Sequence, residues 1–568
     1  MTTTPTGPFL LYAAGSNGRG QLATADLQDA YTFTPCTFNG CQRGALPPGT
    51  LSVIAVKGGS NHSLALLSRP IDSSPNHPRI EVWGCGDGTK GQLGPTYVNE
   101  AGDNRAIFRR IALPLEDHGL AGYEISDVAA CWETSFFVLT KDGQHDVLIS
   151  MGGDVFGDLG IGGLGTENRK ALPFHIIGFT HIVGPDAHGP SITDITTGPH
   201  HAVVLLRAGN KQHVAGWGTA RHGQLGPLHA PSGRALPFSP SPVAINLPID
   251  TQLDPVCSVR AGNQHSLFLH ASGRVSALGS DAKGQLRGLH TAEDVQAIGC
   301  SWNGSYLQTR TGLLSAGANT HGQLGREGVS ETALGPVNVP DTSRVVDIVC
   351  GSEHVLCVLE SQGQAEVWGW GWNEHGNLAT GSLSDVRAPV RIWPPSPAQA
   401  GEKTGEVVGV WAGGQHTTAR FPSSPETHQY CKRFLDHGTI GACLPDPIVG
   451  GIYKEVLDLA VMTLTVKATL YALYLAPYMA LHVGDDCKWS DVMPVGLSTF
   501  TPKRRVPTVP MSFCVSLRLV SQAGGVIGSL GSARIGISLE NSYTTTHWQL
   551  LYWRCITLSP DQGLLFCR

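Results

Sequence analysis

Histidine is the residue type in this chain whose spacing first suggests chemistry. Five histidines each close a Gly-x-x-His turn between two apolar runs, namely His62, His201, His265, His354 and His416. Imidazoles that meet in space could bind a metal ion or exchange protons. These five fall one to a repeat, and two further repeats carry Thr134 or Gly304 at the same position. We therefore predict that each histidine is neutral, bonded to its neighbouring turn, and not part of a joint site.

Glycine-rich sequences that could hold a dinucleotide phosphate begin at Gly86 and Gly160. Such a site needs a preceding strand, a following helix and an acidic residue downstream. Both sequences lie within β-type repeats without helical periodicity after them, so we interpret them as turns. The chain also has no G-x-S-x-G elbow, no GxxxxGK(S/T) phosphate loop and no H-E-x-x-H sequence. We therefore predict a non-enzymatic protein with no catalytic, cofactor-binding or metal-binding residues.

Three tryptophans stand at turn positions that other repeats fill differently. Trp132 and Trp302 follow the first residue of the Gly-x-x-His turn, where another repeat has Ser60. Trp372 follows the first glycine of a different, Gly-rich turn. An exposed tryptophan is a typical anchor of a protein interface. We predict that Trp132, Trp302 and Trp372 bind a partner; the alternative is that each packs against the adjacent repeat.

The elements that position these residues are seven copies of one turn motif. The motif reads Gly-x-(Asn/Asp)-x-x-Gly-(Gln/Asn/Asp)-Leu and begins at Gly15, Gly152, Gly218, Gly279, Gly317 and Gly371, with a looser copy at Gly86. The glycines permit positive φ, and the Asn or Asp can bond its own backbone. A motif that returns at intervals along a chain indicates a repeat architecture.

The Gly-x-x-His motif alternates with this turn and joins two short apolar runs. Runs of this length, bounded by Gly and Asn, are typical of strands. Seven units of antiparallel strands can close into a ring that leaves few exposed edges. The chain opens with a single strand and ends its repeats without a last Gly-rich turn. We therefore predict an all-β, seven-bladed propeller over residues 9–421, closed by the N-terminal strand.

The paired motifs resemble the repeat of the regulator of chromosome condensation family, a family of seven-bladed β-propellers. Its founding member is a guanine-nucleotide exchange factor for the small GTPase Ran. Residues 10–22, LLYAAGSNGRGQL, and the following TADLQDAYTFTP are similar to the branch of the fungal alpha-tubulin suppressor protein. That resemblance implies an adaptor that binds the small zinc protein of diphthamide synthesis and supports Elongator-dependent modification of the tRNA wobble uridine. Exchange activity on a Ran-type GTPase is the alternative.

Composition adds expectations about partners and location. The formal net charge is −6, and the acidic excess falls within the repeats, so we expect a basic protein partner and no direct binding of nucleic acid. The N-terminus lacks a basic region before an apolar run, and the 14 cysteines show no CxxC spacing. We therefore expect reduced thiols and a protein located in the cytoplasm, either alone or also in the nucleus.

Three longer insertions, at residues 70–80, 227–248 and 393–406, are rich in Pro and Ser or in polar residues and read as loops on one face. They are either partner-contacting loops or tolerated surface loops. Residues 425–568 contain no repeat, and we expect an irregular C-terminal extension of unknown fold, with partial disorder or a gene-model artefact as alternatives. Its apolar run at 456–483 favours a buried helix over a membrane span, because charged residues and a proline interrupt it.

Overall fold

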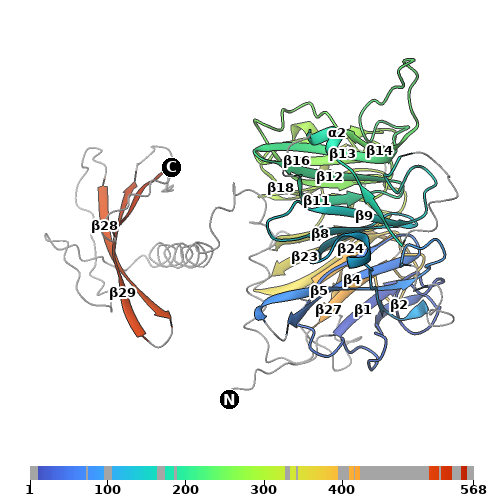
Figure 1. Ribbon diagram of the computed structural model, residues 1–568, viewed down its shortest axis with the longest axis horizontal. Helices are drawn as coiled ribbons and strands as arrows, with labels where there is room; N and C mark the ends of the chain where they lie inside the picture. Colours follow the sequence, from blue (N-terminus) through green and yellow to red (C-terminus); the bar gives the residue numbers. More distant parts are fainter. Residues whose placement is uncertain are drawn as a thin grey trace. The chain divides into compact units, whose positions relative to one another are not determined.

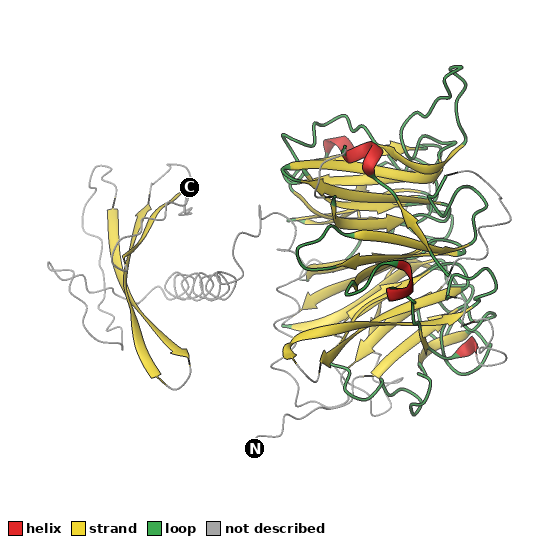
Figure 2. Ribbon diagram, viewed as in Figure 1, coloured by secondary structure: helices red, strands yellow, loops and turns green. Residues whose placement is uncertain are grey.

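A computed structural model describes residues 10–421, with gaps at 72–73, 95–96, 98–104, 163–172, 185–188, 327–332, 341–342, 362, 395–408 and 415, and the strands within 511–559. The chain divides into two compact units, Met1–Leu444 and Pro445–Arg568. In the described part of the first unit, strands joined by loops and turns predominate and helices are few and short (Figure 2). Its short helices are η2 (Glu116–His118), α2 (Thr180–Val183) and η4 (Leu289–Thr291).

Seven antiparallel sheets, here called blades, make up this unit (Figure 1). Blade 1 contains β3 (Ser52–Gly58), β4 (His62–Ile71), β5 (Ser74–Gly86) and β6 (Arg109–Arg110). Blade 2 contains β7 (Glu124–Ala130), β8 (Thr134–Thr140), β9 (Val147–Gly152) and β10 (His175–Ile177). Blade 3 contains β11 (Ser191–Thr197), β12 (His201–Ala208), β13 (Lys211–Thr219) and β14 (Phe238–Ala244).

The remaining blades repeat this order of strands. Blade 4 contains β15 (Val256–Ala261), β16 (His265–His270) and β17 (Val275–Gly279). Blade 5 contains β18 (Val295–Cys300), β19 (Gly304–Thr309), β20 (Gly312–Gly317) and β21 (Gly335–Pro336). Blade 6 contains β22 (Arg344–Cys350), β23 (His354–Ser361), β24 (Gln364–Gly371) and β25 (Val386–Trp393). Blade 7 contains β26 (Gly409–Ala412), β27 (His416–Phe421), β1 (Leu10–Gly15) and β2 (Ala30–Pro35).

The N-terminal strand closes the ring. β1 pairs with β27 in unbroken antiparallel register from Leu10 opposite Phe421 to Gly15 opposite His416. β1 and β2 thereby supply the two outer strands of blade 7, whose inner strands come from the end of the repeats. The predicted seven-bladed propeller with N-terminal closure is confirmed.

Each blade is covered on both broad faces by its neighbours, and this explains the continuous apolar second strands. The first six residues of β12 and all of β16 are buried. One core cluster joins Val204 and Leu206 of blade 3 to Phe136 of blade 2. A strand buried on both faces reads as an apolar run without the alternation of a half-exposed strand.

The turns of the blades gather at two faces. The Gly-x-x-His turn after each first strand and the Gly-rich turn after each third strand lie at the same end of the blade, which we call the turn face. The hairpin between the second and third strands lies at the other end, the opposite face. Residues 70–80 belong to the β4–β5 hairpin at the opposite face, whereas residues 227–237 connect β13 to β14 at the turn face. The insertions therefore do not share a face as expected, because they interrupt different strand connections; residues 395–406 lie outside the described part.

The second unit is described only by its strands. β28 (Met511–Ala523), β29 (Val526–Leu539) and β30 (Tyr552–Ser559) form an antiparallel sheet in that order. The apolar run at 456–483 lies outside the described residues. Among the residues that are described, no helix has the length and hydropathy needed to cross a membrane.

Candidate partner-binding face

The five repeated histidines join neighbouring blades at the turn face. Each begins a second strand, is almost fully buried, and reaches a hydroxyl in the next blade. The Nε2 to hydroxyl-oxygen distances are 2.9 Å for His62–Ser135, 3.1 Å for His201–Ser266, 3.1 Å for His265–Ser305, 3.2 Å for His354–Thr417 and 3.0 Å for His416–Ser63. The structure confirms that the histidines lie in separate blades, and it shows that their partner is a side chain of the next blade.

The direction of these hydrogen bonds sets the state of the imidazole. Ser63 Oγ donates to the Gln21 carbonyl at 2.8 Å, and Ser266 Oγ donates to the Gln224 carbonyl at 2.9 Å. A serine has one proton to donate, so each hydroxyl must accept from the histidine Nε2–H. The histidine Nδ1 atoms are buried without a partner among the described residues. Burial lowers the pKa of His201 to about 3, which keeps the ring neutral.

The two repeats without histidine show that the histidine and the hydroxyl occur together. Blade 2 has Thr134 in place of histidine, and the facing position of blade 3 is Ala202. Blade 5 has Gly304, and the facing position of blade 6 is Val355. Both members of the pair are missing at these two boundaries. This pattern identifies the pair as a contact between blades and explains why the histidines do not assemble a reaction centre.

Replacing Ser266 with alanine tests this contact. The variant leaves His201 Nε2 buried without an acceptor, which costs about 1–3 kcal/mol of the free energy of unfolding. Urea unfolding of the wild type and of Ser266→Ala gives the difference. A cost near zero would contradict the assignment. The double variant His201→Ala/Ser266→Ala, which lacks both members of the pair as the natural Thr134–Ala202 boundary does, should cost less than the two single variants added together.

Two of the predicted tryptophans meet at the mouth of the central channel. Trp132 lies between β7 and β8, and Trp302 lies between β18 and β19, three blades further along the ring. Their ring centroids are 5.8 Å apart at an interplanar angle of 32°. Both side chains are half-buried. Backbone hydrogen bonds hold the two turns, because Trp132 N–H donates to the Pro199 carbonyl at 2.9 Å and Trp302 N–H to the Ser352 carbonyl at 2.7 Å.

A short aromatic patch continues from this pair toward blade 2. The rings of Trp132 and His200 of blade 3 are stacked with centroids 5.8 Å apart. The ring of Phe156 packs edge-on against His200, with centroids 4.9 Å apart. His200 Nδ1 lies 3.2 Å from Asp158 Oδ1, so a carboxylate orients the ring. Phe156 is 36% exposed and Val155 is 60% exposed. Trp132 thus packs on the adjacent blade and also contributes to an exposed apolar surface.

Trp372 belongs to a different cluster, nearer the rim of the turn face. Its ring lies 5.4 Å from that of His375 and 6.3 Å from that of His321. Asp29 accepts from His375 and Asp385 from His321, each at 2.8 Å. The structure therefore brings Trp132 and Trp302 together and places Trp372 apart from them. Binding of a partner by any of the three stays a prediction.

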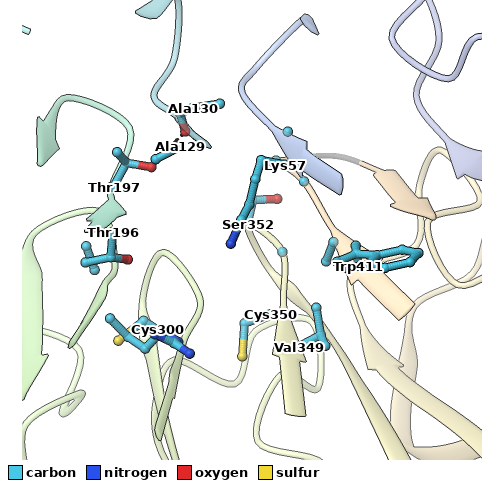
Figure 3. A pocket seen from close by; sticks show the side chains of 18 of the residues that line it. Lys57, Ala129, Ala130, Thr196, Thr197, Cys300, Val349, Cys350, Ser352 and Trp411 are labelled. Carbon is cyan, nitrogen blue, oxygen red and sulfur yellow. Dashed lines mark hydrogen bonds between the residues drawn. The ribbon is translucent and has the colours of Figure 1, made fainter. Parts of the chain in front are cut away.

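The channel below the tryptophan pair is a cavity of about 400 Å³ lined by the first strands of all seven blades. Figure 3 shows Lys57, Thr196, Cys300 and Cys350 around it, each from a different blade. Arg260 Nη1 lies 3.6 Å from Asp194 Oδ2 within the same lining. Burial raises the pKa of the Cys300 and Cys350 thiols, so these thiols are poor nucleophiles. Among the described residues, there is no group of three or more His, Cys, Asp or Glu side chains that could bind a metal ion.

The sequence did not reveal His200 and Phe156 as members of the aromatic patch. His200 precedes a repeated histidine, and Phe156 occupies a turn position that other repeats fill with Arg, Lys or His. The second feature was a usable signal, since a phenylalanine replaces a basic or histidine side chain at one copy of an exposed turn. The neighbours of each tryptophan depend on the closed ring and have no counterpart in the spacing of the motifs.

The fold defines a seven-bladed propeller, and part of it matches a known repeat. Residues 312–358 and 364–420, in blades 5 to 7, match the model of the regulator of chromosome condensation (RCC1) repeat. A second model of the same repeat matches residues 345–377. A relative whose name includes this repeat is similar over 66% of the chain.

Two relatives and one solved structure are similar to this chain over most of its length. The secretion-regulating guanine nucleotide exchange factor of Mus musculus is 27% identical over 458 residues, which cover 73% of this chain and 85% of the relative. An RCC1 repeat-containing protein of Schizosaccharomyces pombe is 25% identical and covers 66% of this chain and 91% of the relative. Prp20p of Saccharomyces cerevisiae, described with its binding to Gsp1p and histones, has a TM-score of 0.53 at 18% identity over 76% of this chain and 95% of its own. This last likeness shows the fold alone.

Proposed function

We propose that the protein is a regulatory binding propeller that holds a small GTPase on its turn face and promotes release of the bound nucleotide. The observation that carries the proposal is the half-buried pair Trp132–Trp302, which lies at the mouth of the channel among exposed apolar side chains. Central aromatic side chains are the typical anchors of protein interfaces. The name of the mouse relative, a guanine nucleotide exchange factor, supports a GTPase as the partner.

Exchange of this kind requires no catalytic side chain. A binding surface that prefers the nucleotide-free state of its partner shifts the equilibrium toward nucleotide release, by as much as its affinities for the two states differ. The turn face offers hydrogen-bonding groups and an aromatic centre for such a contact. The neutral, bonded state of the repeated histidines is consistent with a surface that binds and does not react.

A second proposal follows from residues 10–22, which resemble the fungal alpha-tubulin suppressor protein. In this proposal the same propeller is an adaptor for the small zinc protein of diphthamide synthesis and for Elongator-dependent modification of the tRNA wobble uridine. Both proposals place the protein in the cytoplasm, either alone or also in the nucleus, which imaging of the tagged full-length chain would test.

Affinity capture with the full-length chain distinguishes the two proposals. We expect mass spectrometry of the captured proteins to identify a small GTPase that is released when GTP or GDP is added. Purified protein should then accelerate the loss of a fluorescent GDP analogue from that GTPase. Capture of a small zinc protein or of Elongator subunits, without a GTPase, would favour the adaptor and overturn the exchange proposal.

Truncation of the tryptophans tests the face itself. Trp132→Ala and Trp302→Ala should each weaken capture by about 30-fold, the effect of removing a central anchor worth about 2 kcal/mol. The Tm of each variant should differ little from that of the wild type, because both side chains are half-exposed. Trp132→Phe, which keeps an aromatic ring against His200, is the matched control and should retain most of the binding. A loss of thermal stability that matches the loss of binding would show that the tryptophans serve packing alone.

A further inference from the structure

The tips of the seven Gly-rich turns form a ring on the turn face. The tip is the residue before the second glycine of each motif, and the seven tips are Arg19, Lys90, Phe156, His222, Lys283, His321 and His375. Six of these seven are basic residues or histidines. They come from different blades, so the closed propeller spaces them around the aromatic centre at Trp132 and Trp302.

The same pair of hydrogen bonds positions these tips in most blades. The tip N–H donates to the side chain two residues later, at 3.0 Å from Arg19 to Gln21, 3.0 Å from Lys90 to Gln92, 3.0 Å from Phe156 to Asp158, 3.0 Å from His222 to Gln224, 2.8 Å from Lys283 to Gln285 and 2.8 Å from His321 to Gln323. The Asn or Asp of the motif accepts from the leucine N–H, as Asn17 does from Leu22 at 3.0 Å. The tip side chains therefore project from turns of a fixed shape.

Three cations of the ring are available to a partner. Arg19, Lys90 and Lys283 are exposed, and none has an ion pair within the described part of the chain. At the opposite face, by contrast, Arg274 pairs with Asp254 at 2.9 Å and Arg310 with Asp294 at 3.5 Å.

Several carboxylates of the turn face already accept hydrogen bonds. Asp29 and Asp385 bond the tip histidines His375 and His321. Glu353 accepts from Asn303 at 2.6 Å and from Gln323 at 2.7 Å. Two exposed carboxylates lie close to tips: Glu374 precedes His375, and Asp281, two residues before Lys283, lies 3.9 Å from Arg287 Nε. The seven tips themselves carry three cations and no carboxylate, although the chain as a whole carries −6.

We propose that the turn face recognises an acidic protein surface, with one apolar side chain of the partner seated on Trp132 and Trp302 and its carboxylates facing Arg19, Lys90 and Lys283. This inference rests on the proposed function to the extent that the face binds a protein, and it adds the chemistry of the partner. It differs from the expectation of a basic partner, which rested on the net charge alone. Complementary charges at the edge of an interface chiefly raise the association rate and select the partner.

Two other occupants fit the charges less well. A second copy of the chain, face to face, would bring the same basic tips together and would repel itself. Nucleic acid would gain few phosphate contacts from three free cations and would meet the negative field of the whole chain. An acidic protein segment needs only a few carboxylates and can use the aromatic centre, which a phosphate backbone cannot.

Fluorescence anisotropy with defined probes tests this inference on the full-length protein. The probes are a labelled Glu-rich peptide with one central Phe, the same peptide with Lys in place of Glu, and a labelled DNA duplex. We expect the acidic peptide to bind best and to weaken as salt is added. The variant Arg19→Glu/Lys90→Glu/Lys283→Glu should weaken it about 30-fold, from roughly threefold for each of the three exposed charges.

Lys211→Glu is the matched control, because Lys211 is exposed and begins, at the opposite face, the strand that leads to the His222 turn. This variant should bind the acidic peptide as the wild type does.

Three results would each overturn the inference: the triple variant binds the acidic peptide as tightly as the wild type does, the wild type binds the Lys peptide or the duplex more tightly than the acidic peptide, or the wild type self-associates. If the triple variant still captures a GTPase while Trp132→Ala does not, the proposed function stands and the acidic chemistry of the partner fails. If the acidic peptide binds but no GTPase is captured, the acidic chemistry of the partner stands and the proposed function fails.

Discussion

Lowering the pH from 7 to 5.5 is expected to reduce the free energy of unfolding of the propeller by about 5 kcal/mol, or about 1 kcal/mol for each of five buried histidines. Burial lowers the pKa of His62, His265 and His416 to about 4 and that of His201 and His354 to about 3. An unfolded histidine titrates near 6.5, as model peptides do. A loss of this size is comparable with the whole stability of many domains.

The sign follows from which state binds more protons. Between about pH 6.5 and the folded pKa near 4, the unfolded chain has protonated histidines and the folded chain has neutral ones, so acid favours unfolding. The histidine contribution is therefore complete above pH 6.5 and is lost as the pH falls. Asp127, Asp347 and Glu353 act in the opposite direction at lower pH, because burial raises the pKa of each carboxyl and the folded state takes up their protons first.

Urea unfolding at a series of pH values between 7 and 4.5 measures this dependence. His201→Gln removes one of the five groups and keeps a side-chain N–H that can donate to Ser266. Its stability should vary with pH about four-fifths as steeply as that of the wild type, whatever its stability at pH 7. A slope equal to the wild type's, or a wild type that is equally stable at pH 7 and 5.5, would contradict the neutral state assigned to these rings.

Gly262→Ala is expected to destabilise the propeller by about 3 kcal/mol, because it adds a methyl group where there is no space. A Cβ atom at Gly262 would lie 2.1 Å from His265 Cε1 and 2.7 Å from the Ser301 carbonyl oxygen of the next blade. The histidine ring is locked by its bond to Ser305, and the carbonyl belongs to the backbone. Neither neighbour can move without breaking a contact between blades.

The matched control is Gly178→Ala, since a Cβ there meets no atom within 4 Å and the backbone is not left-handed. In thermal unfolding, the Tm of Gly262→Ala should be several degrees below that of the wild type, and the Tm of Gly178→Ala should be nearly unchanged. The double variant Gly262→Ala/His265→Ala relieves the contact with the ring, so its cost should be smaller than the two single costs added. Strict additivity would show that the clash is not with the imidazole.

Local sequence determined the architecture of this protein. The seven Gly-rich turns require glycines at positive φ, as at Gly15 and Gly317, and in five of them an Asn or Asp bonds the following leucine N–H. These requirements are local, so they are visible in the order of the residues. The strand-turn-strand units, their number and the closure by β1 follow from counting the copies. The one-per-blade placement of the histidines follows in the same way.

Tertiary structure alone decided the contacts between blades and across the ring. Trp132 and Trp302 meet because closure brings turns of distant blades to one channel mouth, and nothing in their local sequences encodes that meeting. The hydroxyl partner of each histidine comes from the next blade, so the pairing emerges only when the blades are packed. The sign of the charge at the turn face also depends on the fold, because net charge counts residues whereas recognition depends on which of them are exposed and unpaired.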